Sequence, residues 1–243
     1  MQTREQIVEF FQQKLWRLFI HPVYASGIKD VKFKNMLKME HDNKHKIVPP
    51  QETGGKTSAE AHRDCLSREG AREVYLEAKK RLLDINRWDE YAGVASATFQ
   101  LTDLLGNEIA RSPEMGDLIR ISIPGPGSVA GDGYDWVEIE TYIETIDAIR
   151  DIDLFAFRVR PTHKPGSAAE VPAHFYTEDA TSTFLVQRAG NKVTAAEKGR
   201  NEVPNTGAET IRDKVRNTLV GAGASLGLSI PQWKALMEGI LEP

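Results

Sequence analysis

The chain has 243 residues, of which 40% are hydrophobic and 27% are charged, and its formal net charge is −4. This composition is typical of a folded globular protein and excludes collagen-like, disordered and membrane-spanning chains. The single cysteine, Cys65, cannot form an internal disulfide, which excludes a disulfide-stapled secreted scaffold. Because the first predicted helix has charged residues in place of the apolar segment of a targeting peptide, we expect a cytoplasmic protein.

The first predicted helix covers residues 3–20. Apolar side chains recur there at spacings of three and four, and Pro22 follows where the helix is expected to end. Such an apolar side must be covered by other atoms, either of the protein's own core or of a partner. Phe11, Trp16 and Phe19 lie on that side and are candidate partner-binding residues.

A basic stretch without a sustained period follows at residues 27–57. Lys34 and Lys38 are candidate partner-binding residues there, because a basic arm can meet an acidic surface of a neighbouring subunit. An RNA contact through the same lysines is a further hypothesis. Since Phe33 is the only nearby aromatic side chain that could stack on a base, we expect no nucleic-acid partner.

A second helix is predicted over Ala59–Ile85, a segment rich in Ala, Leu, Glu, Lys and Arg. Thr57 and Glu60 have the spacing of a capping box at its start. Gly70 is expected to weaken this helix or to divide it in two.

From about residue 93 the hydrophobic period becomes two residues, which predicts strands. Ala189, Gly190 and Asn191 form a short hairpin turn between the last two of them. The candidate strands are Ser96–Leu101, Leu118–Ile123, Trp136–Ile143, Leu154–Arg160, Thr183–Gln187 and Lys192–Glu197. Because few of the connections are long enough for a helix, we expect an antiparallel sheet or a partly open barrel of about six strands.

Two helices are predicted at the C-terminal end. The first contains Ile211, Val215 and Leu219 at helical spacing, and the second begins near Ser229 and Pro231. The expected fold class is therefore α+β, with N-terminal helices, the central sheet and two C-terminal helices that cover one of its faces or edges.

The net charge of −4 is unevenly distributed over three predicted regions. A helical region with a basic loop, residues 1–86, has a net charge of +4, and an acidic β domain, residues 87–206, has −8. The C-terminal helical pair, residues 207–243, is neutral and is expected to pack on the β domain. Opposite charges on two regions favour association between copies or subunits of a protein assembly.

Candidate ligand-binding residues lie in and after the two long loops of the predicted sheet, where binding groups are often found. Tyr134 and Trp136 stand beside several acids, as in a small sugar-binding or partner-binding patch. His163 and His174 flank the second long loop together with nearby acids, so they are candidates for acid–base chemistry. Arg200 is a candidate for contact with an anionic group.

No complete catalytic, metal or nucleotide-binding motif is present. Ser225 stands in a G-x-S-x-G pattern, but a helix is expected before it and no histidine follows it. Gly54–Thr57 lacks the first glycine of a phosphate-binding loop. His41 and His45 have no third metal ligand nearby, so we expect neither a metal nor a cofactor, and we assign no catalytic residue.

These observations predict a non-catalytic structural or interaction subunit of a larger protein assembly. It would associate with other protein subunits through its N-terminal helix, its basic arm and its acidic β domain. The alternative is a protein with a pocket for a small apolar ligand, which could act as an enzyme through a loop histidine.

Overall fold

The computed structural model describes residues 47–93, 97–123, 128–168, 171–207, 217, 220 and 230–243. By its internal contacts the chain divides into residues 1–44 and residues 45–243, and all the described residues belong to the second unit. The predicted helix over residues 3–20 lies outside the described residues. The same holds for the candidate partner-binding residues Phe11, Trp16, Phe19, Lys34 and Lys38.

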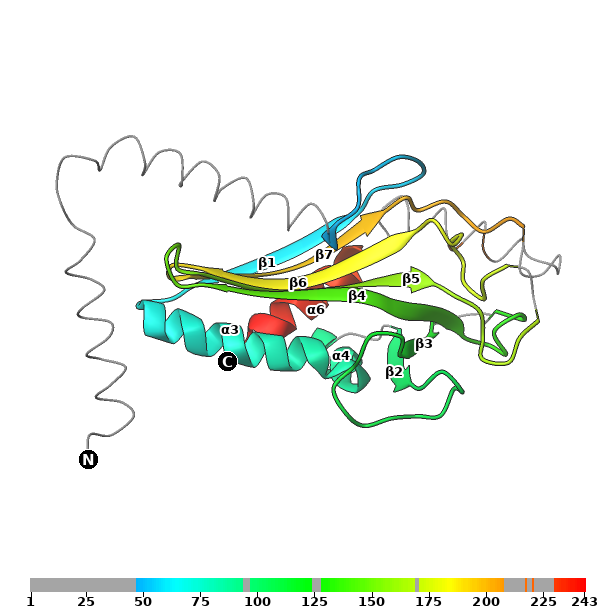
Figure 1. Ribbon diagram of the computed structural model, residues 1–243, viewed down its shortest axis with the longest axis horizontal. Coiled ribbons are helices and arrows are strands. Elements are labelled where there is room, and N and C mark those ends of the chain that lie inside the picture. Colours follow the sequence, from blue (N-terminus) through cyan, green and yellow to red (C-terminus); the bar gives the residue numbers. More distant parts are fainter. Residues whose placement is uncertain are drawn as a thin grey trace, which may run out of the picture. The chain divides into compact units, whose positions relative to one another are not determined.

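The described chain is built on one antiparallel sheet of seven strands, in the order β1-β7-β6-β5-β4-β3-β2. The strands are β1 (Ser58–Asp64), β2 (Thr98–Thr102), β3 (Leu118–Ser122), β4 (Asp135–Asp147), β5 (Ile152–Pro161), β6 (Thr181–Ala189) and β7 (Lys192–Arg200). The sheet is strongly curled and open, with β1 and β2 at its two edges (Figure 1). All six predicted strands are confirmed. The seventh strand, β1, was not predicted.

The predicted helix over Ala59–Ile85 is wrong in its first third. That part is β1, which pairs with β7 so that Ser58 faces Lys198 and Asp64 faces Lys192. The composition of this segment favours a helix, but backbone hydrogen bonds to a strand more than 120 residues away outweigh that preference. Local helix propensity does not include such distant contacts. The capping box at Thr57 is also wrong, because the helix starts later.

The helices of the described chain are α3 (Arg68–Leu83), a short 3₁₀ turn η1 (Ile85–Arg87), α4 (Trp88–Ala92) and α6 (Ile230–Leu241). Ser67 caps α3, since its hydroxyl oxygen accepts a hydrogen bond of 3.0 Å from the backbone N–H of Gly70. α6 confirms the last predicted helix. Of the helix predicted before it, only Asn217 and Val220 are described, and both are helical.

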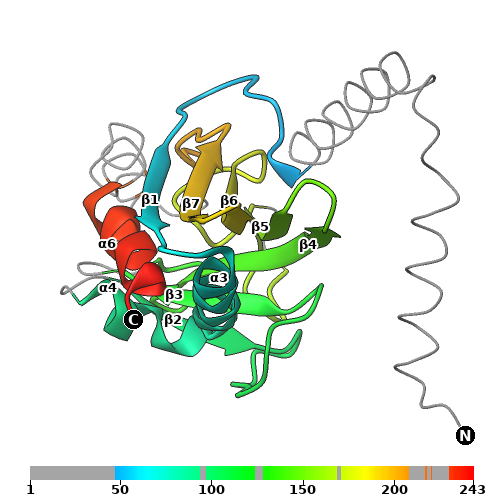
Figure 2. The same cartoon turned by 90° about the vertical axis from the view of Figure 1, so that its left-hand side faces the viewer.

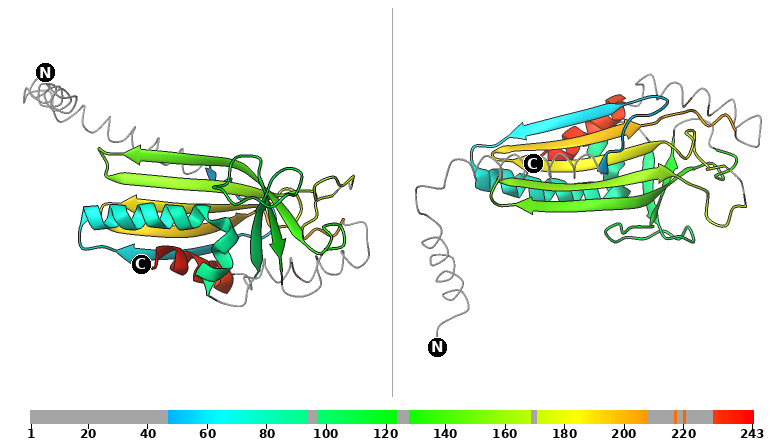
Figure 3. Two further views of the ribbon diagram at one scale, coloured as in Figure 1. Left: turned by 90° about the horizontal axis from the view of Figure 1, so that it is seen from below. Right: turned by 45° about the horizontal axis from the view of Figure 1, so that its top comes forward.

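The helices α3 and α6 lie against the same face of the sheet, here called the inner face (Figures 2 and 3). The α+β class is thus confirmed, but two of the described helices precede β2 and one follows β7. The main hydrophobic core lies between α3, α4, α6 and the inner face. Because β1 and β7 both contact α6, segments from the two ends of the described chain complete one side of this core.

The opposite, outer face of the sheet has a smaller core. Ile47 covers Leu154, Ala156, Leu185 and Ala196 there. Its carbonyl oxygen accepts a hydrogen bond from the Arg158 guanidinium at 3.0 Å. None of the described helices combines the length and the apolar composition that crossing a membrane requires. The compartment stays a prediction.

Candidate functional site

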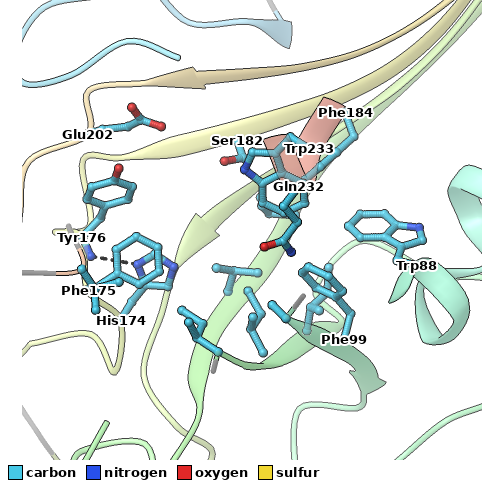
Figure 4. Close-up of a pocket in the computed structure, with 17 residues that line it drawn as sticks. Trp88, Phe99, His174, Phe175, Tyr176, Ser182, Phe184, Glu202, Gln232 and Trp233 are labelled. Atoms are coloured by element: carbon cyan, nitrogen blue, oxygen red, sulfur yellow. Dashed lines mark hydrogen bonds between the residues drawn. The ribbon is translucent and has the colours of Figure 1, made fainter. Parts of the chain in front are cut away.

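A cavity of about 330 Å³ lies between the inner face and α6 (Figure 4). This volume is within the range of pockets that hold small molecules. Most of the lining is aliphatic or aromatic: Trp88, Ala97, Phe99, Ile119, Ile121, Ile123, Val137, Val159, Phe175, Tyr176, Phe184, Val220 and Trp233. The polar lining side chains are His174, Ser182, Glu202 and Gln232. A mostly apolar pocket with a few polar groups suits a ligand that is itself mostly apolar.

The aromatic wall of the pocket is built around Trp88. Its ring centroid lies 5.2 Å from that of Phe99 and 4.8 Å from that of Phe184. Trp233 of α6 completes the group, 5.3 Å from Phe184 and nearly perpendicular to it. The Trp88 indole N–H also donates to the carbonyl oxygen of Leu82 at 3.2 Å, so this wall is fixed in position before a ligand arrives.

His174 stands in the loop before β6. Its Nδ1 accepts a hydrogen bond of 2.9 Å from the backbone N–H of Tyr176, as the dashed line in Figure 4 shows. A neutral imidazole whose Nδ1 is an acceptor has its proton on Nε2 and can donate there. The ring also stacks on Phe175, with centroids 4.2 Å apart, and Asn205 donates to the His174 carbonyl oxygen at 3.1 Å. The loop therefore presents His174 to the pocket in one orientation.

Glu202 lies in the segment that follows β7 and is buried. The Thr57 hydroxyl donates to its Oε1 at 2.7 Å. The carboxyl group lies directly over Gly199 of β7, where any side chain would collide with both Glu202 and Thr57. Burial raises the pKa of Glu202, while the hydrogen bond from Thr57 and the charge of Arg200 act in the opposite direction.

A second acid, Glu197 of β7, lies on the inner face but is not among the residues that line the pocket. It is 1% exposed, and its cross-strand neighbours are Ala59 on β1 and Phe184 on β6. Neither oxygen of its carboxyl group has a full hydrogen bond among the described residues. Buried polar groups in proteins are nearly always hydrogen-bonded, and the Ser182 hydroxyl is the neighbouring group that interacts with this carboxyl group.

The environment of Glu197 disfavours its charged form. Burial, and next the charge of Glu202, raise the pKa of Glu197 to about 8. The Ser182 hydroxyl and the positive charges of Lys198 and Arg200 oppose the shift without cancelling it. At neutral pH this carboxyl group is therefore mostly protonated.

Of the candidate ligand-binding residues predicted from the sequence, His174 lines the pocket. Trp136 and Tyr134 do not. Trp136 is buried in a separate small core with Leu118 and Ala173, and its indole N–H donates to the Gly131 carbonyl oxygen at 3.3 Å.

His163 and Arg200 are also outside the lining of the pocket. The Arg200 guanidinium donates to the carbonyl oxygens of Gly199 at 2.6 Å and Thr57 at 3.3 Å, so it joins β7 to the start of β1. The Nε2 of His163 is buried and has no hydrogen-bond partner among the described residues.

Most residues of the pocket were not predicted as binding residues. Trp88, Phe99, Phe184 and Trp233 are typical core residues, and nothing in their local pattern distinguishes a pocket wall from a packed core. Glu197 did have a signal. It follows Val193 and Ala195 at intervals of two on β7, which places a carboxyl group on an apolar strand face.

No protein-family model and no curated protein matches this chain. Among solved structures, truncated norcoclaurine synthase from Thalictrum flavum aligns with a TM-score of 0.33 and 10% identity, over 79% of this chain and 96% of that chain. Ara h 8.0201 aligns with a TM-score of 0.29 and 10% identity, over 77% and 99%. Ginseng major latex-like protein 151 from Panax ginseng aligns with a TM-score of 0.26 and 12% identity, over 73% and 99%.

The prediction of a non-catalytic, oligomer-forming subunit of a protein assembly is contradicted. The described chain has instead the apolar pocket that the alternative prediction expected. The prediction was wrong because it took the absence of a catalytic motif and the separation of charge as signs of assembly, although a pocket needs neither. Alignments with TM-scores this low carry no argument about a ligand, so the pocket itself must supply it.

Proposed function

We propose that this chain binds a small, mostly apolar molecule in the pocket between the inner face and α6. The observation that carries the proposal is the cavity of about 330 Å³ with an aromatic wall and polar groups (Figure 4). Such a wall favours a flat or aromatic ligand, because stacked and edge-on ring contacts add to the burial of apolar surface.

The polar groups of the pocket orient such a ligand. In Figure 4, Trp88 and Phe99 lie at one end of the pocket, and His174 and Glu202 lie at the other. A ligand with an apolar body and one polar end therefore fits in one direction. Because His174 lines this end of the pocket, its imidazole supports a polar contact with the ligand.

Naphthalenemethanol, an uncharged aromatic alcohol smaller than the pocket, is a suitable first probe. We expect calorimetric titration of the full chain to show saturable binding of one molecule. Ile121→Trp should weaken this binding at least tenfold, because Ile121 lines the pocket and the larger side chain occupies the ligand's space. The matched control is Ile146→Trp on β4, where the side chain is 63% exposed and lies outside the pocket lining.

Equal binding by both variants would contradict the proposal, because the ligand would then be held elsewhere. Absence of saturable binding in the wild-type chain, with this probe and with aliphatic alcohols of similar size, would also overturn it.

A further inference from the structure

Gln232 is a polar residue on the apolar side of α6. It stands four residues before Leu236, so it shares the helix face that carries this buried core residue. Its side chain lines the pocket, and Figure 4 shows the terminal amide projecting from α6 into the space between Phe99 and His174. An apolar side chain would fill this space at lower free-energy cost, unless the amide has a hydrogen-bond partner.

The other polar side chains of the pocket already interact with the protein. His174 accepts a hydrogen bond from the backbone, Glu202 accepts one from a threonine hydroxyl, and Ser182 interacts with a carboxyl group on β7. None of the described residues forms a hydrogen bond with the amide of Gln232. The hydrogen bonds of this amide are therefore left for a ligand to make.

We infer that Gln232 determines the specificity of the pocket by pairing with a planar carboxamide group of the ligand. This inference rests on the ligand-binding function proposed above. The amide of Gln232 has an acceptor oxygen and N–H donors in one plane, and a carboxamide presents the same groups in return, so the two can form a pair of hydrogen bonds. A ketone would leave the oxygen of Gln232 without a donor, and a single hydroxyl oxygen cannot align with both groups at once.

The packing of α6 holds Gln232 at the pocket. The ring centroid of the next residue, Trp233, lies 5.7 Å from that of Phe99 on β2. Near the other end of the helix, the Arg81 guanidinium donates to the Gly239 carbonyl oxygen at 3.0 Å. Rotation of the helix out of the pocket would break both contacts, so the donor and acceptor groups of Gln232 are in position before a ligand arrives.

A charged planar group matches this position less well than a carboxamide does. Because none of the described residues that line the pocket is a lysine or an arginine, a carboxylate would lose its hydration without gaining an opposite charge. A guanidinium group has N–H donors only and would leave the N–H groups of Gln232 without an acceptor. The matching ligand is therefore an uncharged carboxamide on an aromatic body, with its rings against the wall around Trp88.

The test compares two uncharged probes of the same shape, 2-naphthamide and 2-isopropylnaphthalene, by calorimetric titration of the full chain. The measured quantity is the Kd of the hydrocarbon divided by the Kd of the amide, because the difference in hydration between the probes is the same for every variant. Gln232→Met keeps the length of the side chain and removes its amide. This ratio should fall by about fivefold or more through the loss of two neutral hydrogen bonds, while the hydrocarbon still binds.

The matched control is Lys234→Met on the same helix, where the side chain is 60% exposed and lies outside the pocket lining. It should leave the ratio unchanged. The ratio also distinguishes binding from a structural role, because Gln232 follows Ser229 at the spacing of a helix capping box. If Gln232 only capped the helix, Gln232→Met would change the free energy of unfolding in urea and leave the ratio as it is in the wild type.

Each outcome separates the two proposals. If the hydrocarbon binds and the ratio falls by less than the expected amount in Gln232→Met, or falls equally in Lys234→Met, the pocket function stands and the amide inference is overturned. If the wild-type chain binds the hydrocarbon but not the amide, the inference is also overturned. If neither compound binds, the proposed function itself fails.

Discussion

Replacement of Glu197 by glutamine should stabilise the protein increasingly as the pH rises. The substitution retains the shape of the side chain and removes the only part of it that ionises. In the wild-type chain the folded state binds the Glu197 proton more tightly than the unfolded state does, because the pKa is about 8 in the fold against an ordinary value of 4.5. Stability conferred by this proton is fully present below pH 4.5 and is lost as the pH rises through 8.

The size of the effect follows from the pKa difference. Each pKa unit corresponds to about 1.4 kcal/mol, so the shift of Glu197 corresponds to roughly 5 kcal/mol in total. Between pH 5 and pH 9, the wild-type chain should lose about 4 kcal/mol of unfolding free energy relative to Glu197→Gln. Acids that do not interact with Glu197, such as Glu140, whose pKa is lowered by its arginine partners despite burial, contribute equally to both chains and cancel in the difference.

Urea unfolding at pH 5, 7 and 9, followed by tryptophan fluorescence, measures this difference, provided that the dependence on urea is the same in both chains. The control Glu60→Gln removes an acid from the exposed face of β1, and its difference from the wild type should change little with pH. If the difference between the wild type and Glu197→Gln stays constant from pH 5 to pH 9, Glu197 titrates normally and the reasoning about its burial is refuted.

Three further substitutions test side-chain packing in the described part of the fold by urea unfolding. Gly199→Ala should cost about 1–3 kcal/mol, since the added methyl group displaces a buried carboxyl group, and a loss below 0.5 kcal/mol would contradict the close approach. Trp88→Ala should cost about 3–5 kcal/mol, against a few tenths for Leu105→Ala at an 80% exposed position, and equal losses would place Trp88 outside the core. Arg188→Met should cost about 3–5 kcal/mol because it leaves Asp153 buried and unpaired, and the loss should shrink when Asp153→Leu is added.

Much of the sheet could be predicted because its strands are patterned locally. Phe155, Phe157 and Val159 alternate with residues of the outer face, and the structure places all three in the main core. β1 could not be predicted in this way. Its Ala, Glu and Arg residues favour a helix, and only the pairing with β7 determines its conformation.

The pocket was harder to predict than the fold. A cavity is space that side chains from several distant segments leave unfilled, and the sequence of any one segment does not show it. His174 was predicted because a loop histidine is a candidate for acid–base chemistry, yet the same criterion selected His163, which does not line the pocket. Glu197 was overlooked for the opposite reason. A single acid within a strand is commonplace on a solvated face, and its spacing from Val193 and Ala195 was the one indication of burial before the structure placed Phe184 and Ala59 on either side.

The pairing of β1 with β7 also has a consequence for the order in which the fold assembles. Strands β4 to β7 each pair with the next strand along the chain, so their contacts are more local than those of β1 and can form early. β1 must wait for β7, about 130 residues away, and α6 packs on both. We therefore expect α6 to pack onto the sheet last during folding and to detach first. A ligand would then enter and leave by local unfolding at this edge of the sheet, while the central strands stay in place.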